Sequence, residues 1–271
     1  MGFLTDLTNE LRRHLAARPL DEAGLLARAS AHPPARDLVS ALRVSSPALI
    51  AEVKRASPSV GEIDDAVDPV DRASAYAEGG AAAISVLTEQ RYFHGSLADL
   101  QAVRVSVSIP VLRKDFLVHP AQVIEARAWG ADAVLLITAS LSDHELAAML
   151  AVTHDLGMEA IVETHADEEL ARAVDAGAVV IGVNARDLES LEVDVDRALA
   201  RLDQVPSDRL AVFESGVKTR ADVQAAVTAG ASAVLVGEAL MRAHDPRAAA
   251  RELVGGAADT GAEGDRRTAA R

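Results

Sequence analysis

The 271-residue chain has no cysteine, which excludes a disulfide scaffold, a thiol nucleophile and a thiolate zinc site. Basic residues are in deficit: 27 Lys and Arg against 41 Asp and Glu give a net charge of −14, a poor match to a nucleic-acid backbone. Apolar runs reach only about six or seven residues, against the roughly 20 that span a bilayer. Met1 is followed by a polar, charged segment with no secretory signal. With 49% hydrophobic residues, we expect a globular, soluble, cytoplasmic protein without a nucleic-acid or membrane partner.

Lysine is scarce among the basic residues. Only Lys54, Lys114 and Lys218 stand beside 24 arginines. Arginine stays protonated, whereas the pKa of a lysine can be tuned for proton transfer. The lysines therefore mark candidate positions where an ammonium is required, although chance retention explains any single one equally well.

A short glycine-containing phrase recurs four times along the chain. In each copy an amphipathic stretch ends near a glycine and runs into a short apolar segment; the glycines are Gly80, Gly130, Gly177 and Gly230. This order is typical of a helix that ends and feeds a buried parallel strand. The glycines are 50, 47 and 53 residues apart, which corresponds to two strand–helix units per repeat.

Apolar runs of strand length lie between the repeats and complete the pattern. The eight predicted strands cover residues 48–54, 82–87, 109–114, 132–137, 158–163, 179–184, 210–215 and 233–237. Amphipathic helices are predicted between them, among others at 69–78, 120–129, 143–156, 167–176 and 219–229. This alternation predicts an α/β protein with a (β/α)8 TIM barrel. A doubly wound sheet is the alternative, but residues 55–59 lack the glycine-rich turn usual in such folds.

The barrel is predicted to occupy residues 47–254, with extensions on both sides. Residues 1–46 carry a helical pattern broken by Pro33 and Pro34, and we expect extra N-terminal helices packed on the barrel. Residues 255–271 are rich in Gly, Ala, Asp and Arg without apolar periodicity, which predicts a disordered tail.

Polar residues gather at the predicted carboxyl ends of the strands, where the active sites of such barrels lie. Ion pairs that close the barrel mouth could explain one or two of them, but buried charges are costly unless paired. A converging set of this size indicates a catalytic site. The set comprises Glu52, Lys54, Lys114, Glu163, Asn184 and Glu214.

The last two strand ends also contain glycine, at Gly216 and Gly237. Loops after the seventh and eighth strands, where backbone N–H groups can approach an anion, form the usual phosphate site of this fold. The steric needs of a tight turn are the alternative explanation of each glycine.

Six motifs, in order over roughly residues 45–250, resemble those of the indole-3-glycerol-phosphate synthase family. They are residues 49–59, 92–96, 112–116, 182–188, 214–217 and 236–241. The resemblance implies a carboxy-lyase of tryptophan biosynthesis that closes 1-(2-carboxyphenylamino)-1-deoxyribulose 5-phosphate to indole-3-glycerol phosphate, with loss of CO₂ and water. It implies no cofactor, and the scattered histidines give no metal-ligand spacing.

The resemblance also implies roles for the strand-end residues. Lys114 matches the general acid of ring closure, and Glu163 matches the acid or base of the later dehydration. Lys54 matches a substrate-contacting lysine that helps closure or dehydration, and Glu52 matches a residue that orients these groups. Asn184 and Glu214 match further polar residues of the mouth.

Binding residues follow in the same way. The phosphate positions are Ser57, Ser215, Gly216, Gly237 and Glu238, and Arg186 belongs to the substrate-binding set. The aromatic ring needs an apolar pocket, and ordinary core packing explains each candidate residue equally well. The candidates by position are Pro58, Phe93, Phe116, Leu135, Leu188 and Leu191.

Two positions depart from the family pattern. Val60 stands where many members have lysine, and Phe213 occupies a position where the residue is usually smaller.

Other activities stay open: a phosphosugar isomerase, an aldolase with a Schiff base on Lys114 or Lys54, or a barrel that has lost catalysis and serves as a binding protein. The expected partner is a small phosphorylated substrate, and the expected state is a monomer or a weak homodimer.

Overall fold

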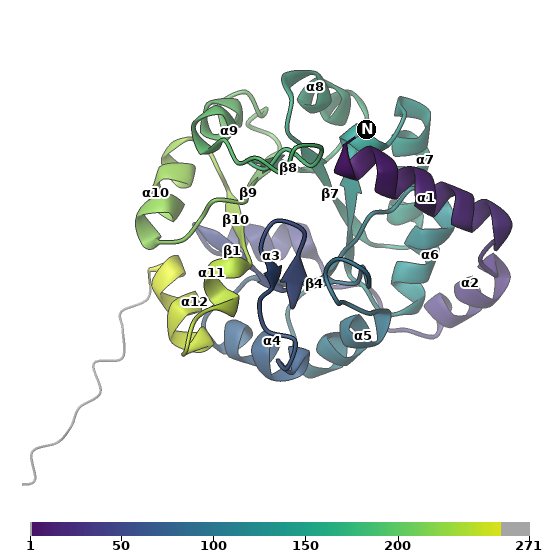
Figure 1. Ribbon diagram of the computed structural model, residues 1–271, viewed down its shortest axis with the longest axis horizontal. Coiled ribbons are helices and arrows are strands. Elements are labelled where there is room, and N and C mark those ends of the chain that lie inside the picture. Colours follow the sequence, from purple (N-terminus) through teal and green to yellow (C-terminus); the bar gives the residue numbers. More distant parts are fainter. Residues whose placement is uncertain (1, 256–271) are drawn as a thin grey trace, which may run out of the picture.

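The computed structural model describes residues 2–255, which contain a closed barrel of eight parallel strands (Figure 1). The strands are β1 (Ala48–Val53), β4 (Ala83–Leu87), β5 (Val111–Lys114), β6 (Ala133–Ile137), β7 (Glu159–Thr164), β8 (Val180–Asn184), β9 (Leu210–Glu214) and β10 (Ala233–Val236). Strand β1 pairs with both β4 and β10 and closes the ring. The TIM-barrel prediction is confirmed, and every strand begins and ends within two residues of its predicted bounds.

A ring of helices surrounds the strands (Figure 1). It comprises α4 (Pro69–Glu78), α5 (Leu97–Ser106), α6 (Pro120–Ala128), α7 (Asp143–Asp155), α8 (Asp167–Asp175), α9 (Val195–Leu202), α10 (Arg220–Thr228), α11 (Glu238–Met241) and α12 (Pro246–Val254). Side-chain caps start several of them, such as Asp68 before α4 and Ser142 before α7. The repeated glycines lie just after α4, α6, α8 and α10 with φ between 85° and 108°, as expected at helix ends.

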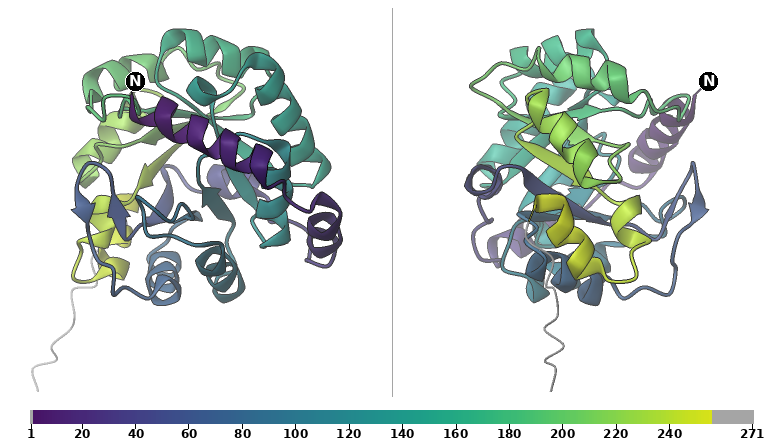
Figure 2. Two further views of the ribbon diagram at one scale, coloured as in Figure 1. Left: turned by 45° about the vertical axis from the view of Figure 1, so that its right-hand side comes forward. Right: turned by 90° about the vertical axis from the view of Figure 1, so that its left-hand side faces the viewer.

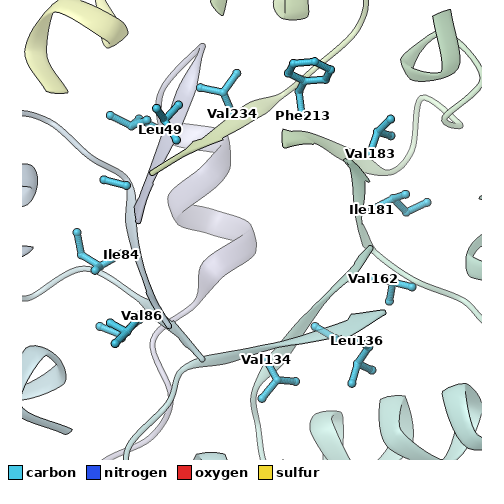
Figure 3. Close-up of a cluster of buried hydrophobic side chains, with 14 of the residues drawn as sticks. Leu49, Ile84, Val86, Val134, Leu136, Val162, Ile181, Val183, Phe213 and Val234 are labelled. Carbon is cyan, nitrogen blue, oxygen red and sulfur yellow. The ribbon is translucent and has the colours of Figure 1, made fainter. Parts of the chain in front are cut away.

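The strands bury both faces, and alternate residues belong to two apolar layers. In β1, Leu49 and Ala51 face the helices, whereas Ile50 faces the barrel interior with residues such as Leu112 and Ile161. Figure 3 shows side chains of the outer layer around the strands. Phe213, the large residue of β9, belongs to this outer layer and is 1% exposed, so its size does not reduce the space at the barrel mouth.

Three helices precede the barrel: α1 (Phe3–Ala17), α2 (Glu22–Ser30) and α3 (Leu38–Val44). Helix α3 leads directly into β1, and its Leu38 and Leu42 join the inner apolar layer. Helix α1 lies at the opposite end, on the same side as a short hairpin (Figure 2). Backbone hydrogen bonds tie α1 to the loop after β8, from Phe3 N–H to the Glu189 carbonyl (3.3 Å) and from Leu4 N–H to the Leu188 carbonyl (3.2 Å).

The hairpin joins β2 (Ala56–Ser57) and β3 (Gly61–Glu62) after the first barrel strand, and the sequence did not predict it. Val60 lies in its turn and is 39% exposed. A short 3-10 helix, η1 (Thr138–Ser140), follows β6. No helix within residues 2–255 has the length and apolar character to cross a membrane. Residues 256–271, where the sequence predicts a disordered tail, lie outside the described residues.

Candidate active site

A cavity of about 580 Å³ opens at the carboxyl ends of the barrel strands. Every residue that the sequence singled out for catalysis or substrate binding lines this cavity. This follows from the parallel topology, because all eight strands end at the same rim and their last polar side chains point inward.

Lys114 lies between two carboxylates. Its ammonium donates to Glu163 Oε2 at 2.9 Å and to Glu214 Oε2 at 2.6 Å. The three side chains come from β5, β7 and β9 and are 13%, 4% and 2% exposed, so the cluster is nearly withdrawn from water. Such a buried triad holds its charges in fixed positions.

Burial and charge set the protonation of this triad. Burial alone would lower the pKa of Lys114, but the charges of Glu163 and Glu214 outweigh it and raise that pKa above its ordinary value. Burial would likewise raise the pKa of Glu163, yet Lys114 and a hydrogen bond from Asn184 hold it below the usual range. For Glu214, burial is the largest effect and raises the pKa to about 8. These shifts favour a charged Lys114, the ionised form of Glu163 and the protonated form of Glu214.

Glycine makes room for the Glu214 carboxyl group. A Cβ at Gly182, in the neighbouring strand β8, would lie 2.4 Å from Glu214 Oε1. This oxygen is buried and has no hydrogen-bond partner among the described residues. An ionised carboxylate with one unpaired buried oxygen is costly, which agrees with the raised pKa of Glu214.

A second ion pair lies on β1 and just after it. Lys54 Nζ lies 3.0 Å from Glu52 Oε1, and the side chains are 18% and 5% exposed. The two residues are two apart in an extended segment, so both reach the cavity as the sequence predicted. Gly237 permits this arrangement, since a Cβ there would lie 2.4 Å from the Glu52 carboxylate.

Asn184 connects the triad to the loop after β8. Its amide donates to Glu163 Oε1 at 3.0 Å, and its carbonyl oxygen accepts from the Arg186 N–H at 2.9 Å. These two bonds fix which way the amide faces. The Arg186 guanidinium lines the cavity and donates to the Leu191 carbonyl at 2.9 Å.

Aromatic side chains form one wall of the cavity. Phe93 and Phe116 have ring centroids 6.2 Å apart, and Phe3 of α1 lies 6.2 Å from Phe116 and 5.0 Å from Tyr92. Leucines extend this apolar wall: Leu135, Leu188 and Leu191. A planar aromatic group can lie against such a surface.

The opposite end of the cavity is suited to an anion. Ser215 and Gly216 follow β9 with φ of 67° and 81°, and Gly237 starts the short helix α11. A left-handed serine is strained, and such strain is concentrated at functional sites. Glu238 would repel an anion, but its carboxylate pairs with Arg242 at 3.1 Å.

The sequence interpretation missed several cavity residues, among them Phe3, Lys218 and Arg242. Phe3 reaches the cavity only through the docking of α1. Lys218 carried a signal in the rarity of lysine, and Arg242 in its spacing of four residues from Glu238. Within residues 2–255, no cluster of three or more His, Asp or Glu side chains could hold a metal ion.

Comparison with known proteins agrees with this geometry. The family model described as Indole-3-glycerol phosphate synthase matches residues 4–253. The indole-3-glycerol phosphate synthase of Rhodococcus opacus (strain B4) is 52% identical over 256 residues, covering 94% of this chain and 95% of the relative. That of Mycobacterium tuberculosis (strain ATCC 25177 / H37Ra) is 51% identical over 253 residues and covers 93% of each chain.

Solved structures of low identity share the fold. A 3-hexulose-6-phosphate synthase is 20% identical with a TM-score of 0.61, covering 76% of this chain and 98% of that one. A chain of the tryptophan synthase complex from Pyrococcus furiosus is 17% identical with a TM-score of 0.59, covering 77% and 98%. At these identities the likeness concerns the barrel alone. The family model and the relatives above half identity show that this chain belongs to the indole-3-glycerol phosphate synthase family.

Proposed function

We propose that the chain closes 1-(2-carboxyphenylamino)-1-deoxyribulose 5-phosphate to indole-3-glycerol phosphate, with loss of CO₂ and water. The observation that carries this proposal is the Lys114 ammonium held between Glu163 and Glu214 in a cavity with an aromatic wall and an anion-binding end. This substrate has an aromatic ring, a carbonyl group that must be protonated, and a phosphate.

The two ends of the cavity orient the substrate. The phosphate would lie against the backbone N–H groups of Ser215–Gly216 and Gly237–Glu238, where Lys218 adds positive charge and Arg242 offsets the charge of Glu238. The carboxyphenyl ring would lie against Phe93 and Phe116. Binding at both ends holds the reacting carbons together and lowers the entropic cost of closure.

Ring closure joins the ring carbon that bears the carboxylate to the carbonyl carbon of the sugar. The electron pair of the carbonyl bond moves to oxygen, which takes a proton from Lys114. The raised pKa of Lys114 keeps the ammonium charged until an alkoxide, a stronger base than an amine, develops beside it. Departure of CO₂ then returns an electron pair to the ring and restores its aromaticity.

Dehydration completes the indole. The new hydroxyl leaves as water with a proton supplied by Lys54, and the ionised Glu163 takes the proton lost as the carbon–carbon double bond forms. Glu52 pairs with Lys54 and orients its ammonium, and Asn184 orients the Glu163 carboxylate. The lowered pKa of Glu163 keeps this carboxylate ionised and therefore free to accept a proton.

The protonated state of Lys114 argues against an aldolase. A Schiff base forms from a neutral amine, whereas the acidic side chains around Lys114 raise its pKa and keep this ammonium charged. We also propose that the protein works as a monomer or weak homodimer, in the cytoplasm.

A product assay tests this proposal. The purified chain is mixed with the carboxyphenylamino-deoxyribulose phosphate in EDTA, and indole fluorescence and released CO₂ are followed. We expect equal amounts of both products, and no borohydride-trapped adduct on Lys114 or Lys54. A folded protein that forms neither product would refute the proposed reaction.

A further inference from the structure

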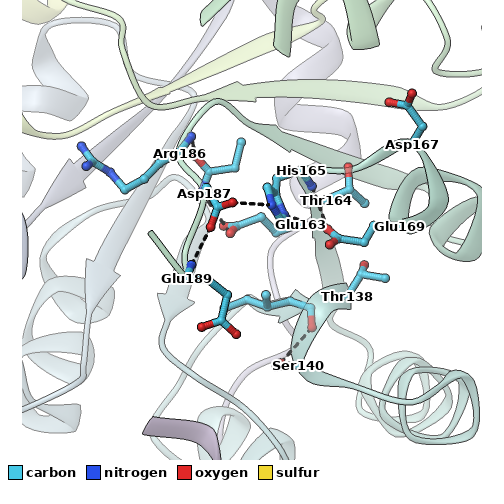
Figure 4. A network of polar contacts seen from close by, with 12 residues as sticks. Thr138, Ser140, Glu163, Thr164, His165, Asp167, Glu169, Arg186, Asp187 and Glu189 are labelled. Atoms are coloured by element: carbon cyan, nitrogen blue, oxygen red, sulfur yellow. Dashed lines mark hydrogen bonds and ion pairs between the residues drawn. The ribbon is translucent and has the colours of Figure 1, made fainter. Parts of the chain in front are cut away.

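His165 lies beside the proposed site, but none of the catalytic steps uses it. It directly follows β7, two residues after Glu163, and its side chain is 26% exposed. Each ring nitrogen contacts a carboxylate from a different element: Nδ1 lies 3.1 Å from Glu169 Oε2 of α8, and Nε2 lies 3.4 Å from Asp187 Oδ2 of the loop after β8 (Figure 4). Because carboxylates only accept, both contacts require a protonated ring. Hydrogen bonding to Glu169 is the main cause that raises the pKa of His165, and Asp187 adds to it.

Asp187 organises the loop that it begins. Its Oδ1 accepts from the N–H groups of Glu189 (2.7 Å) and Ser190 (3.0 Å). Its carbonyl accepts from Leu191 N–H at 2.8 Å, and its own N–H donates to the Glu192 carbonyl at 2.9 Å. One carboxylate oxygen of Asp187 thus holds the turn, and the other faces His165.

The start of this loop also determines the orientation of Glu163, the proposed base. Arg186, the residue before Asp187, donates its N–H to the Asn184 side-chain oxygen at 2.9 Å. The Asn184 amide then donates to Glu163 Oε1 at 3.0 Å. A displacement of the backbone at residues 186–187 would therefore turn the Asn184 amide and release one oxygen of Glu163.

We propose that His165 is a positioning residue: by holding Asp187 against β7 and α8, it keeps the loop 186–192 in place and Asn184 aligned on Glu163. This inference rests on the proposed function. In this role His165 touches no substrate, yet it determines the orientation of the proposed base. It also holds in place the part of the cavity wall formed by Leu188 and Leu191.

Two substitutions at His165 separate its two contacts. The amide nitrogen of glutamine can take the place of Nε2, whereas that of asparagine can take the place of Nδ1. The His165→Asn variant therefore keeps a donor for Glu169, which the residue 165 backbone N–H also contacts at 2.8 Å, and loses only the contact with Asp187. We expect His165→Gln to retain kcat within about threefold and His165→Asn to lose about tenfold or more, because small misplacements of catalytic groups are costly.

Hydrogen exchange of the loop gives a readout that does not depend on turnover. Amides of residues 186–192 should exchange faster in His165→Asn than in the parent, and at the parental rate in His165→Gln. His154→Asn is the matched control, since His154 lies 3.5 Å from Glu159 at the exposed end of α7 and should leave kcat and loop exchange unchanged.

Equal behaviour of the glutamine and asparagine variants, in kcat and in loop exchange, would overturn the inference, whether both resemble the parent or both fall together. If the parent itself forms no product, the proposed function fails. The loop exchange of the two variants then still decides whether His165 holds Asp187.

Discussion

A single methyl group added at Gly182, in strand β8 of the barrel, should displace the Glu214 carboxyl group. A Cβ at this position would lie 2.4 Å from Glu214 Oε1 and 3.2 Å from Ile161 Cγ2. To reach ordinary contact, the Glu214 oxygen must retreat by about 1 Å. Gly182 lies in β8 without positive φ, so alanine suits its backbone and the effect of Gly182→Ala arises from this contact.

The displacement bears directly on Lys114. Its bond to Glu214 Oε2 is 2.6 Å long, and a shift of the carboxyl group by about 1 Å away from Lys114 would stretch this bond beyond hydrogen-bond length. Lys114 cannot simply follow, because Glu163 holds it at 2.9 Å. Overpacking of a dense interior costs about 1–3 kcal/mol of stability, and a misplacement of this size near reacting groups lowers kcat by up to about 10².

The assay combines urea unfolding with steady-state formation of indole product. We expect Gly182→Ala to fold and to lose about 1–3 kcal/mol of unfolding free energy. Its kcat should fall, whereas its KM should change less. In a Glu214→Ala background the same methyl group should cost much less, since the oxygen that it meets is gone. Parental kcat and stability for Gly182→Ala, or additive losses in the double variant, would refute this reasoning.

Further predictions concern pH, substrate binding and stability. Below pH about 8 the buried Glu214 stays protonated while its unfolded counterpart has ionised, so the free energy of unfolding should fall as pH rises from about 4.5 to about 8; urea unfolding of Glu214→Gln should show a flatter profile. Phe116→Ala should raise KM severalfold in steady-state assays, because it removes part of the aromatic wall; an unchanged KM would exclude this surface from substrate binding. Asp132→Ala should cost about 3–5 kcal/mol in urea unfolding, because the fully buried carboxylate pairs with Arg104 at 2.8 Å; a loss below about 1 kcal/mol would contradict a structural role. Lys218→Arg keeps the charge at the cavity rim, and kcat should stay within about twofold; a large loss would mean that the ammonium itself takes part.

The barrel could be predicted because its strands leave a strong signal. Parallel strands that are buried on both faces form continuous apolar runs, as in Ala133–Ile137, and the recurring glycines mark the helix ends before them. The convergence of polar side chains at the barrel mouth could be predicted because strand ends such as Asn184 and Glu214 lie at one rim in any closed parallel barrel.

Features that depend on tertiary packing could not be predicted. The β2–β3 hairpin has two residues in each strand, too few for a periodic pattern. Phe3 enters the cavity because α1 docks on the loop after β8, more than 180 residues away in the chain. The opposite pKa shifts of Glu214, raised by burial, and of Glu163, lowered by Lys114 and by one amide from Asn184, depend on tertiary contacts that sequence spacing does not contain.

The most direct test of the central claim is the turnover of Lys114→Arg. The substitution keeps a positive charge between Glu163 and Glu214 but removes an acid that can release its proton to the substrate carbonyl. We predict a folded protein whose kcat, measured by indole fluorescence and CO₂ release, falls by about 10² or more. Parental turnover by this variant would contradict the assignment of Lys114 as the acid of ring closure.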